Sequence, residues 1–278
     1  MTWENINKID LGILRNARIS LHQAVQIVSA FPRNMLPTDP TDSNASLIWN
    51  SSTNGLESDP VANEGGKSIR VGLSLDSFTL YISVEGKLVS FYEMDTRSVF
   101  QGLEWLKFEL SQLDIASDTI NLDLPYEIED YDYSQSLKIN SDAFGEHCIL
   151  YQNISNVLSG IVDERENALD IRCWPHHFDL ATLIPLESNS DKEIIKSIGV
   201  GLSPGDEAVE EPYIYINVWP SVDYKLLVKY PLILGEWNVE GWSGAILKYS
   251  RLTSSTNQYE DVMKFIDTSI NGLLTELD

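Results

Sequence analysis

The sequence contains few cysteines and few basic residues. Cys148 and Cys173 are the only cysteines among 278 residues, which is too few for a disulfide framework, and they do not form a CxxC metal motif. Nineteen Lys and Arg residues stand against 42 Asp and Glu residues, so the formal net charge is -23. A field of this sign repels phosphate backbones and anionic lipid headgroups, and we therefore expect neither nucleic acid nor a membrane as a partner.

Several sequence signals of location and chemistry are also missing. No apolar run approaches the length that crosses a bilayer, and the first residues lack the basic and apolar regions of a secretory signal. We therefore expect a cytoplasmic protein. The sequence has no GxSxG nucleophile turn, no Walker lysine loop and no HExxH zinc motif, so a nucleotide enzyme is not expected and no motif forces a metal site.

The chain contains an internal repeat. KSIRVGLS at 67–74 and KSIGVGLS at 196–203 are identical at seven of eight positions, an offset of 129 residues (67 to 196). The same offset aligns the apolar residues of an early helical pattern with those of a later one, so that Leu21 falls on Leu150 and Val28 falls on Val157. The helical pattern and the KSI segment therefore both align with later segments at the same offset, which indicates a duplication.

Each copy has the pattern of a helix, several strands and a second helix. The first helix is predicted from Asp10 to Phe31, where Pro32 ends it because proline lacks the amide proton that a helix interior needs. Short β-branched and aromatic runs separated by tight turns predict antiparallel strands. We therefore predict an α+β fold of two tandem pseudo-symmetric repeats, 1–125 and 137–278, packed around a pseudo-twofold axis as one globular unit.

The second copy carries chemical groups that the first lacks. Where the first copy reads WNSSTNG, the second reads WPHHFDL, which contains His176, His177 and Asp179 as candidate catalytic residues. In an extended segment alternate side chains share a face, so His177 and Asp179 would point together and form a ligand pair for a divalent metal ion such as zinc. Two alternatives remain open: a metal-free pocket in which Asp179 fixes the tautomer of a basic histidine, or simple packing of the rings.

Further residues can complete such a site as ligand-binding groups. Additional polar groups come from His22 on the first helix and from Asp206, Glu207 and Glu240 in the second copy, while apolar walls come from Trp219 and Trp242. Aromatic faces bind flat or apolar ligands, although a large core uses tryptophan as well. The elaborated second copy is therefore the predicted location of the pocket.

The blocks WPHHFDLAT, GVGLSPGD and EPYIYINVWP, together with an early LHQAVQ helix, resemble a family of bacterial cytoplasmic proteins of unknown function. The resemblance spans nearly the whole chain and implies where a site lies, but it implies no activity. Family members carry further histidines where this chain has Gln23 and Asn238. If those histidines complete a metal site in the family, the resemblance implies weaker metal binding here.

Two hypotheses of function follow from these residues. In the first, the chain acts on a small molecule as a metal-assisted hydrolase, with His176, His177 and Asp179 in acid-base or metal-ligand roles. In the second, it is a non-catalytic small-ligand-binding or interaction module that uses a Trp- and Tyr-lined pocket. Neither hypothesis specifies the oligomeric state.

Overall fold

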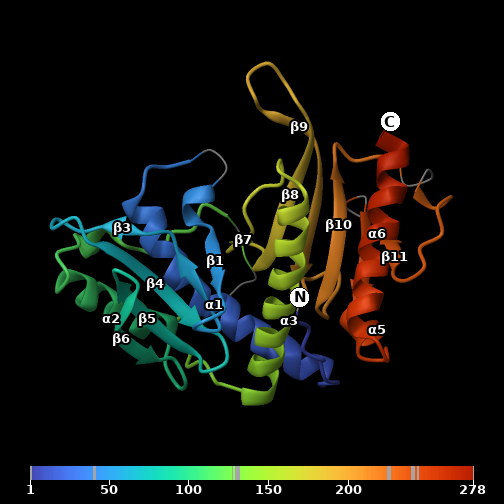
Figure 1. Cartoon of the computed structure of the whole chain (residues 1–278). Coiled ribbons are helices and arrows are strands. Elements are labelled where there is room, and N and C mark those ends of the chain that lie inside the picture. The colour runs from blue at the N-terminus through green and yellow to red at the C-terminus, as the bar shows by residue number, and fades with distance from the viewer. Residues whose placement is uncertain are drawn as a thin grey trace. The chain divides into compact units, whose positions relative to one another are not determined.

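The protein is a mixed α and β structure with antiparallel strands (Figure 1). The computed structural model describes residues 2–39, 42–126, 128, 132–223, 227–238, 242 and 244–277. The helices are α1 (Leu11–Met35), α2 (Val99–Ser111), α3 (Ser141–Glu164), α5 (Tyr249–Leu252) and α6 (Gln258–Leu277), with short 3-10 turns η1 (Ser43–Ala45) and η2 (Ser117–Thr119). The predicted combination of helices with antiparallel strands is confirmed.

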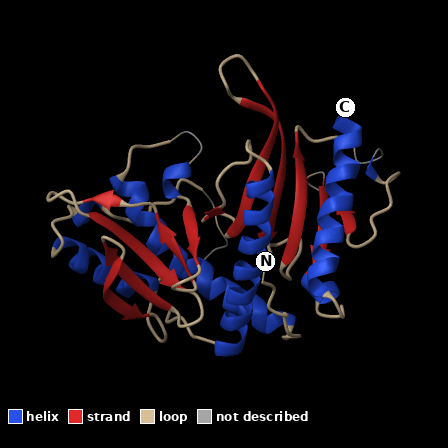
Figure 2. Ribbon diagram, in the orientation of Figure 1, coloured by secondary structure: helices blue, strands red, loops and turns tan. Residues whose placement is uncertain are grey.

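The strands range in length from two residues in β3 to ten in β8 and β9. They are β1 (Leu47–Asn50), β2 (Gly55–Ser58), β3 (Val61–Ala62), β4 (Ser68–Ser74), β5 (Thr79–Val84), β6 (Lys87–Glu93), β7 (Arg172–Trp174), β8 (Asp179–Ser188), β9 (Ile194–Ser203), β10 (Tyr213–Trp219), β11 (Glu236–Asn238) and β12 (Gly244–Lys248). Figure 2 shows these strands in red and the helices in blue. In the described part of the chain, no helix is both long and apolar enough to span a bilayer.

The chain folds into two compact units, and each unit combines segments that are distant in sequence. The N-terminal unit contains Ile9–Cys148 and Arg172–Phe178. The C-terminal unit contains Met1–Lys8, Ile149–Ile171 and Asp179–Asp278. The α3 helix contributes its first turns to the N-terminal unit and its remainder to the C-terminal unit. Strand β7 and the turn after it belong to the N-terminal unit, because β7 pairs with β1.

In the N-terminal unit the strands pair in the order β7-β1-β2-β4-β5-β6, and β3 also pairs with β4. Helix α1 packs on β2 and β4, and α2 packs on β6 and on α1. In the C-terminal unit the order is β8-β9-β10-β12-β11, and α6 packs on β10 and β12. Each unit therefore buries one amphipathic long helix against an antiparallel sheet of its own strands.

Some residue pairings are alike in the two units. Each unit has a row of three paired apolar residues across three adjacent strands: Leu56, Leu73 and Leu80 in the N-terminal unit, and Leu180, Leu202 and Ile214 in the C-terminal unit. One position earlier on the middle strand, Gly72 pairs with Tyr81 and Gly201 pairs with Tyr215. A glycine on the middle strand thus faces a tyrosine on the next strand in both units.

Helix α1 continues beyond Pro32, so the predicted end of this helix at Phe31 is wrong. A proline removes one amide donor, but its carbonyl still accepts, and the Leu36 amide donates to the Pro32 carbonyl oxygen at 2.8 Å. Pro32 is also fully buried with the rest of this part of α1. The lost hydrogen bond is therefore compatible with one further helical turn, which ends at Met35.

Helix α2 begins with a capping box, which makes a local stability prediction possible. The Ser98 hydroxyl accepts from the Gln101 amide at 3.2 Å, and the Gln101 side chain accepts from the Ser98 amide at 2.9 Å. We expect Ser98→Ala to lower the free energy of unfolding by about 1 kcal/mol, because it leaves an N-terminal amide of the helix unsatisfied. Ser111→Ala at the exposed C-terminal end of the same helix is the control, and equal urea midpoints for the two variants would contradict the prediction.

Candidate functional site

Residues Trp174–Phe178 form a tight turn, which we call the histidine turn, between β7 and β8. The amides of His177 and Phe178 both donate to the Trp174 carbonyl, at 3.2 Å and 2.7 Å, and Phe178 has a positive φ of 55°. The extended conformation that we assumed for this segment is therefore wrong. Because the chain turns here, the rings of His176 and His177 do not point to opposite faces but lie with their centroids 4.3 Å apart.

Two side chains of helix α1 donate hydrogen bonds to the backbone of the histidine turn. The carbonyl oxygen of Pro175 accepts a hydrogen bond from Nε2 of His22 at 2.7 Å and another from Nε2 of Gln26 at 2.8 Å. Both side chains are buried, and the His22 ring also stacks on Phe178 at 5.4 Å with an interplanar angle of 5°. His22, predicted as a ligand-binding residue, is therefore placed where it fixes the turn.

A tyrosine outside the predicted set lies against the histidine turn. The Tyr126 ring lies 5.4 Å from the His176 ring, and its hydroxyl donates to Oε1 of Gln26 at 2.8 Å. The Arg33 guanidinium lies 5.9 Å from the Tyr126 ring centroid, and its Nη1 donates to the Tyr126 hydroxyl at 3.2 Å. The sequence signal for Tyr126 was weak, because it belongs to a polar, tyrosine-rich stretch that reads as a connection between the repeats.

The imidazoles of His22 and His176 are neutral at pH 7. The pKa of His176 is lowered to about 4, mainly by burial and to a smaller extent by the neighbouring His177. The charge of Asp42 has the opposite, smaller effect. Burial also lowers the pKa of His22 to about 4. His176 is half-buried and His177 is exposed, so the turn presents imidazole nitrogens to solvent while its backbone remains anchored.

Asp179 accepts a hydrogen bond from a tyrosine of the C-terminal unit. It is the first residue of β8 and is buried, and its Oδ2 accepts from the Tyr215 hydroxyl at 2.5 Å. Two residues earlier on β10, Tyr213 donates to Oδ2 of Asp206 at 2.5 Å. Burial and the hydrogen bond to Asp206 raise the pKa of Tyr213 well above its usual value, so its proton stays on the phenol at neutral pH.

These tyrosines belong to a small apolar cluster, the tyrosine cluster, on one face of the C-terminal sheet. Its buried members are Ala181, Tyr213, Tyr215 and Ile246, and the partly buried Val209 and Trp242 pack against it. The Trp242 and Tyr215 rings meet edge to face at 6.2 Å and 72°. Trp242 therefore covers the tyrosine that Asp179 holds, and the predicted residues Asp179, Asp206 and Trp242 share this cluster.

Of the other predicted residues, Glu207 and Trp219 belong neither to the histidine turn nor to the tyrosine cluster. Glu207 is exposed in the turn that Asp206 caps, and Trp219 is 62% exposed at the end of β10. Glu240 lies outside the described residues. Within the described residues, no three His, Cys, Asp or Glu side chains are grouped so that they can hold a metal ion.

Comparison with known proteins identifies no relative of this chain. No family model matches it, and no curated protein and no solved structure matches it either. The candidate site therefore rests on its own geometry.

Proposed function

We propose that the chain is a small-ligand-binding protein whose binding surface is the histidine turn. The observation that carries this proposal is the anchoring of the Pro175 carbonyl by two buried side chains, His22 and Gln26. Two side chains of α1 thus converge on a single carbonyl of this turn and fix its backbone, while His177 stays exposed. Hydrogen bonds that fix the backbone of the turn before a ligand binds reduce the conformational entropy that is lost on binding. Binding sites are preorganised in this way.

The ligand we propose is a cation, either a divalent transition-metal ion or a small organic cation. Neutral imidazoles offer lone pairs, and this is the protonation state that binds metal ions. The rings of Trp174 and Tyr126 lie 6.2 Å and 5.4 Å from the His176 ring, and aromatic faces attract organic cations. The net charge of -23 also raises the local concentration of cations around the molecule.

The same residues favour binding over hydrolysis. A general base is most effective when its pKa lies near the working pH. With a pKa of about 4, His176 is available as an acceptor at pH 7 but is a weak base. Asp179, the other predicted catalytic group, accepts a hydrogen bond from Tyr215 in the tyrosine cluster. We therefore prefer the ligand-binding hypothesis to the metal-assisted hydrolase.

The four histidines of the chain provide a direct test by NMR of their imidazole nitrogens. We expect the signals of His176 and His177 to shift saturably when zinc ions or spermidine are added to the intact protein. His147, which is fully buried in α3, is the internal control and should not move. A response to zinc alone indicates a metal site, and a response to spermidine alone indicates an organic cation.

Variants separate binding at the turn from general attraction to an acidic surface. We expect the double substitution His176→Ala and His177→Ala to abolish the response to both probes, measured as the ligand-induced rise in melting temperature. Glu207→Gln, which removes an exposed charge in the C-terminal unit, should retain it. An undiminished rise in the double variant, or no saturable shift of either histidine in the wild type, would refute the proposal.

We also infer that the two halves arose by duplication of one unit. Support comes from the near-identical segments at 67–74 and 196–203 and from the matching order of adjacent strands, β2-β4-β5-β6 in one unit and β8-β9-β10-β12 in the other. In each unit the tyrosine hydroxyl donates to a carboxylate two strands away: Tyr81 to Glu57 at 3.0 Å, and Tyr215 to Asp179 at 2.5 Å. Such agreement of side-chain detail is what copies of one ancestral unit would retain.

A further inference from the structure

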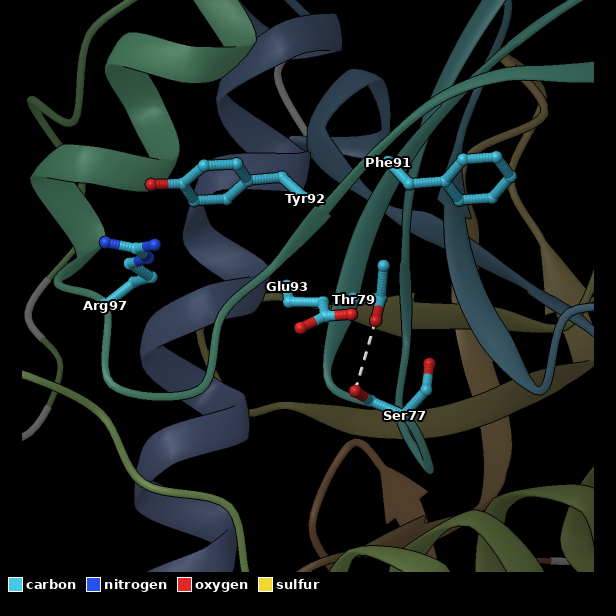
Figure 3. Close-up of a pocket in the computed structure, with 6 residues that line it drawn as sticks. All are labelled: Ser77, Thr79, Phe91, Tyr92, Glu93 and Arg97. Carbon is cyan, nitrogen blue, oxygen red and sulfur yellow. Dashed lines mark hydrogen bonds between the residues drawn. The ribbon is translucent and has the colours of Figure 1, made fainter.

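The N-terminal unit has a pocket of about 560 Å³ that none of the predicted site residues lines. It opens beside β5, β6 and the loop that leads to α2, and its lining residues are Ser77, Thr79, Phe91, Tyr92, Glu93 and Arg97 (Figure 3). Pockets that bind small molecules have volumes of roughly 300–1,000 Å³. The pocket is therefore large enough for a small organic ligand.

Arg97 is held at this pocket by aromatic rings. Its guanidinium lies 6.0 Å from the centroid of the Tyr92 ring, and Tyr92 in turn stacks on Trp105 of α2 at 5.3 Å with an interplanar angle of 19°. Among the described residues, the Arg97 side chain has neither an ion-pair nor a hydrogen-bond partner. Its N–H groups are thus available to a ligand, in a chain whose acidic residues outnumber its basic ones by 42 to 19.

Glu93 brings the opposite charge to the same pocket. It pairs with Thr79 across β5 and β6, so the two side chains share one face of the sheet. Figure 3 shows the Glu93 carboxylate beside Thr79 and Ser77, whereas Arg97 lies with Tyr92 at the other side of the view. No ion pair joins Glu93 to Arg97 within the described residues, so the pocket presents one positive and one negative group separately.

Apolar surface accompanies these charges. Phe91 lies two residues before Glu93 on β6 and is 58% exposed. The Thr79 hydroxyl donates to the Ser77 carbonyl at 3.1 Å, and both residues line the pocket. Phe91 and Tyr92 are successive residues of β6 and point to opposite sides of the strand (Figure 3), with Arg97 on the side of Tyr92. Aromatic surface together with two unpaired opposite charges matches a molecule that carries two charges and an apolar body.

We propose that this pocket binds a small zwitterion with an apolar body, of the kind that aromatic amino acids and short peptides provide. The Arg97 guanidinium binds the carboxylate, the Glu93 carboxylate binds the ammonium group, and the Tyr92 ring contacts the apolar body. An anion without an ammonium group would face Glu93 uncompensated, and a cation without a carboxylate would face Arg97. The proposal uses no residue of the histidine turn, so it stands or falls independently of the function proposed above.

The probes are phenylalanine and two derivatives that each lack one charge. We expect phenylalanine to bind the full-length protein saturably in ligand-observed NMR, with a Kd on the order of 1 mM. Phenylalaninamide lacks the carboxylate and N-acetylphenylalanine lacks the ammonium group. Each derivative should bind about tenfold more weakly, because it leaves one charged side chain of the pocket without its partner.

Charge-removing variants complete the test. Arg97→Gln should lose the preference for phenylalanine over phenylalaninamide, and Glu93→Gln should lose the preference for phenylalanine over N-acetylphenylalanine. Arg251→Gln, an exposed substitution in the C-terminal unit, should preserve both preferences. Circular dichroism checks that all three variants are folded. Absence of saturable phenylalanine binding up to about 10 mM, or unchanged preferences in Arg97→Gln, would overturn the proposal.

Discussion

The free energy of unfolding falls by several kcal/mol as the pH is lowered from 6.5 to about 4, because two buried histidines are neutral in the folded protein. Burial, with a smaller contribution from the nearby charge of Arg18, lowers the pKa of His22 and of His147 from 6.5 to about 4. Nε2 of His22 hydrogen-bonds to the carbonyl oxygen of Pro175, and Nε2 of His147 hydrogen-bonds to the carbonyl oxygen of Leu14.

The sign of this effect follows from proton uptake in the unfolded chain. Below pH 6.5 the unfolded histidines bind protons that the folded ones do not, so protonation favours unfolding. The stabilisation is fully present above pH 6.5 and is lost as the pH falls to about 4. For each of the two histidines the loss is on the order of 3 kcal/mol, which is a large share of the stability of an ordinary domain.

Urea denaturation at about pH 7.5 and about pH 4 measures this effect. The His147→Gln variant keeps a donor for the Leu14 carbonyl but cannot take up the proton, so its stability should fall by about 3 kcal/mol less than that of the wild type. His177→Gln is the matched control, because His177 is exposed, and it should show the wild-type fall. If His147→Gln and the wild type lose equal stability, burial of this ring does not control the pH dependence.

The secondary structure was largely predictable from the sequence, because its signals are local. The alternation of apolar residues on either side of Gly72 and Gly201 marks strands that pair through short turns, and β4 and β9 lie where the repeated segments predict them. The end of α1 was not predictable from Pro32 alone. Whether a helix passes a proline depends on the packing of the residues around it, and the burial of Pro32 is a tertiary effect.

The sequence singles out the segment that forms the histidine turn, but it does not indicate the geometry of this segment. The histidine pair stood out because the segment WNSSTNG, with which we compared WPHHFDL, has only small polar residues at that place. The alternation of side chains along an extended strand predicts that His177 and Asp179 point to the same face. The segment is not extended, because Phe178 adopts a positive φ and closes a turn. No propensity scale indicates that conformation for phenylalanine.

The supporting residues were missed for a different reason. Gln26 looks like one more polar residue of a helix, and Tyr126 lies in a stretch without periodicity. Their hydrogen bond joins residues 100 positions apart. Such pairs leave no local pattern, so a single sequence cannot show them, and the same holds for Arg97 and Trp105 on either side of Tyr92.

The pairing of glycine with tyrosine in each unit predicts a second large effect. A Cβ atom at Gly72 would lie 2.2 Å from Cζ of Tyr81, and one at Gly201 would lie 2.7 Å from Cζ of Tyr215. Real Cβ atoms do not approach this closely, so each tyrosine would have to leave its place. We expect Gly72→Ala and Gly201→Ala each to lower the free energy of unfolding by about 2–4 kcal/mol, from overpacking and from loss of the tyrosine hydrogen bond.

A double-mutant cycle identifies the tyrosine ring as the cause. If the ring opposes the new methyl group, Gly72→Ala should cost much less in a Tyr81→Ala background than in the wild type, and the coupling energy should be on the order of 2 kcal/mol. Gly145→Ala on α3 is the control, because nothing lies within 4 Å of a Cβ atom there, and alanine should stabilise that helix slightly. Additive effects at Gly72 and Tyr81 would show that the loss arises from the strand backbone. Gly201 and Tyr215 make the same kind of close contact, so the same cycle there should give a coupling energy of the same sign, and such parallel coupling is what the duplication that we propose would predict.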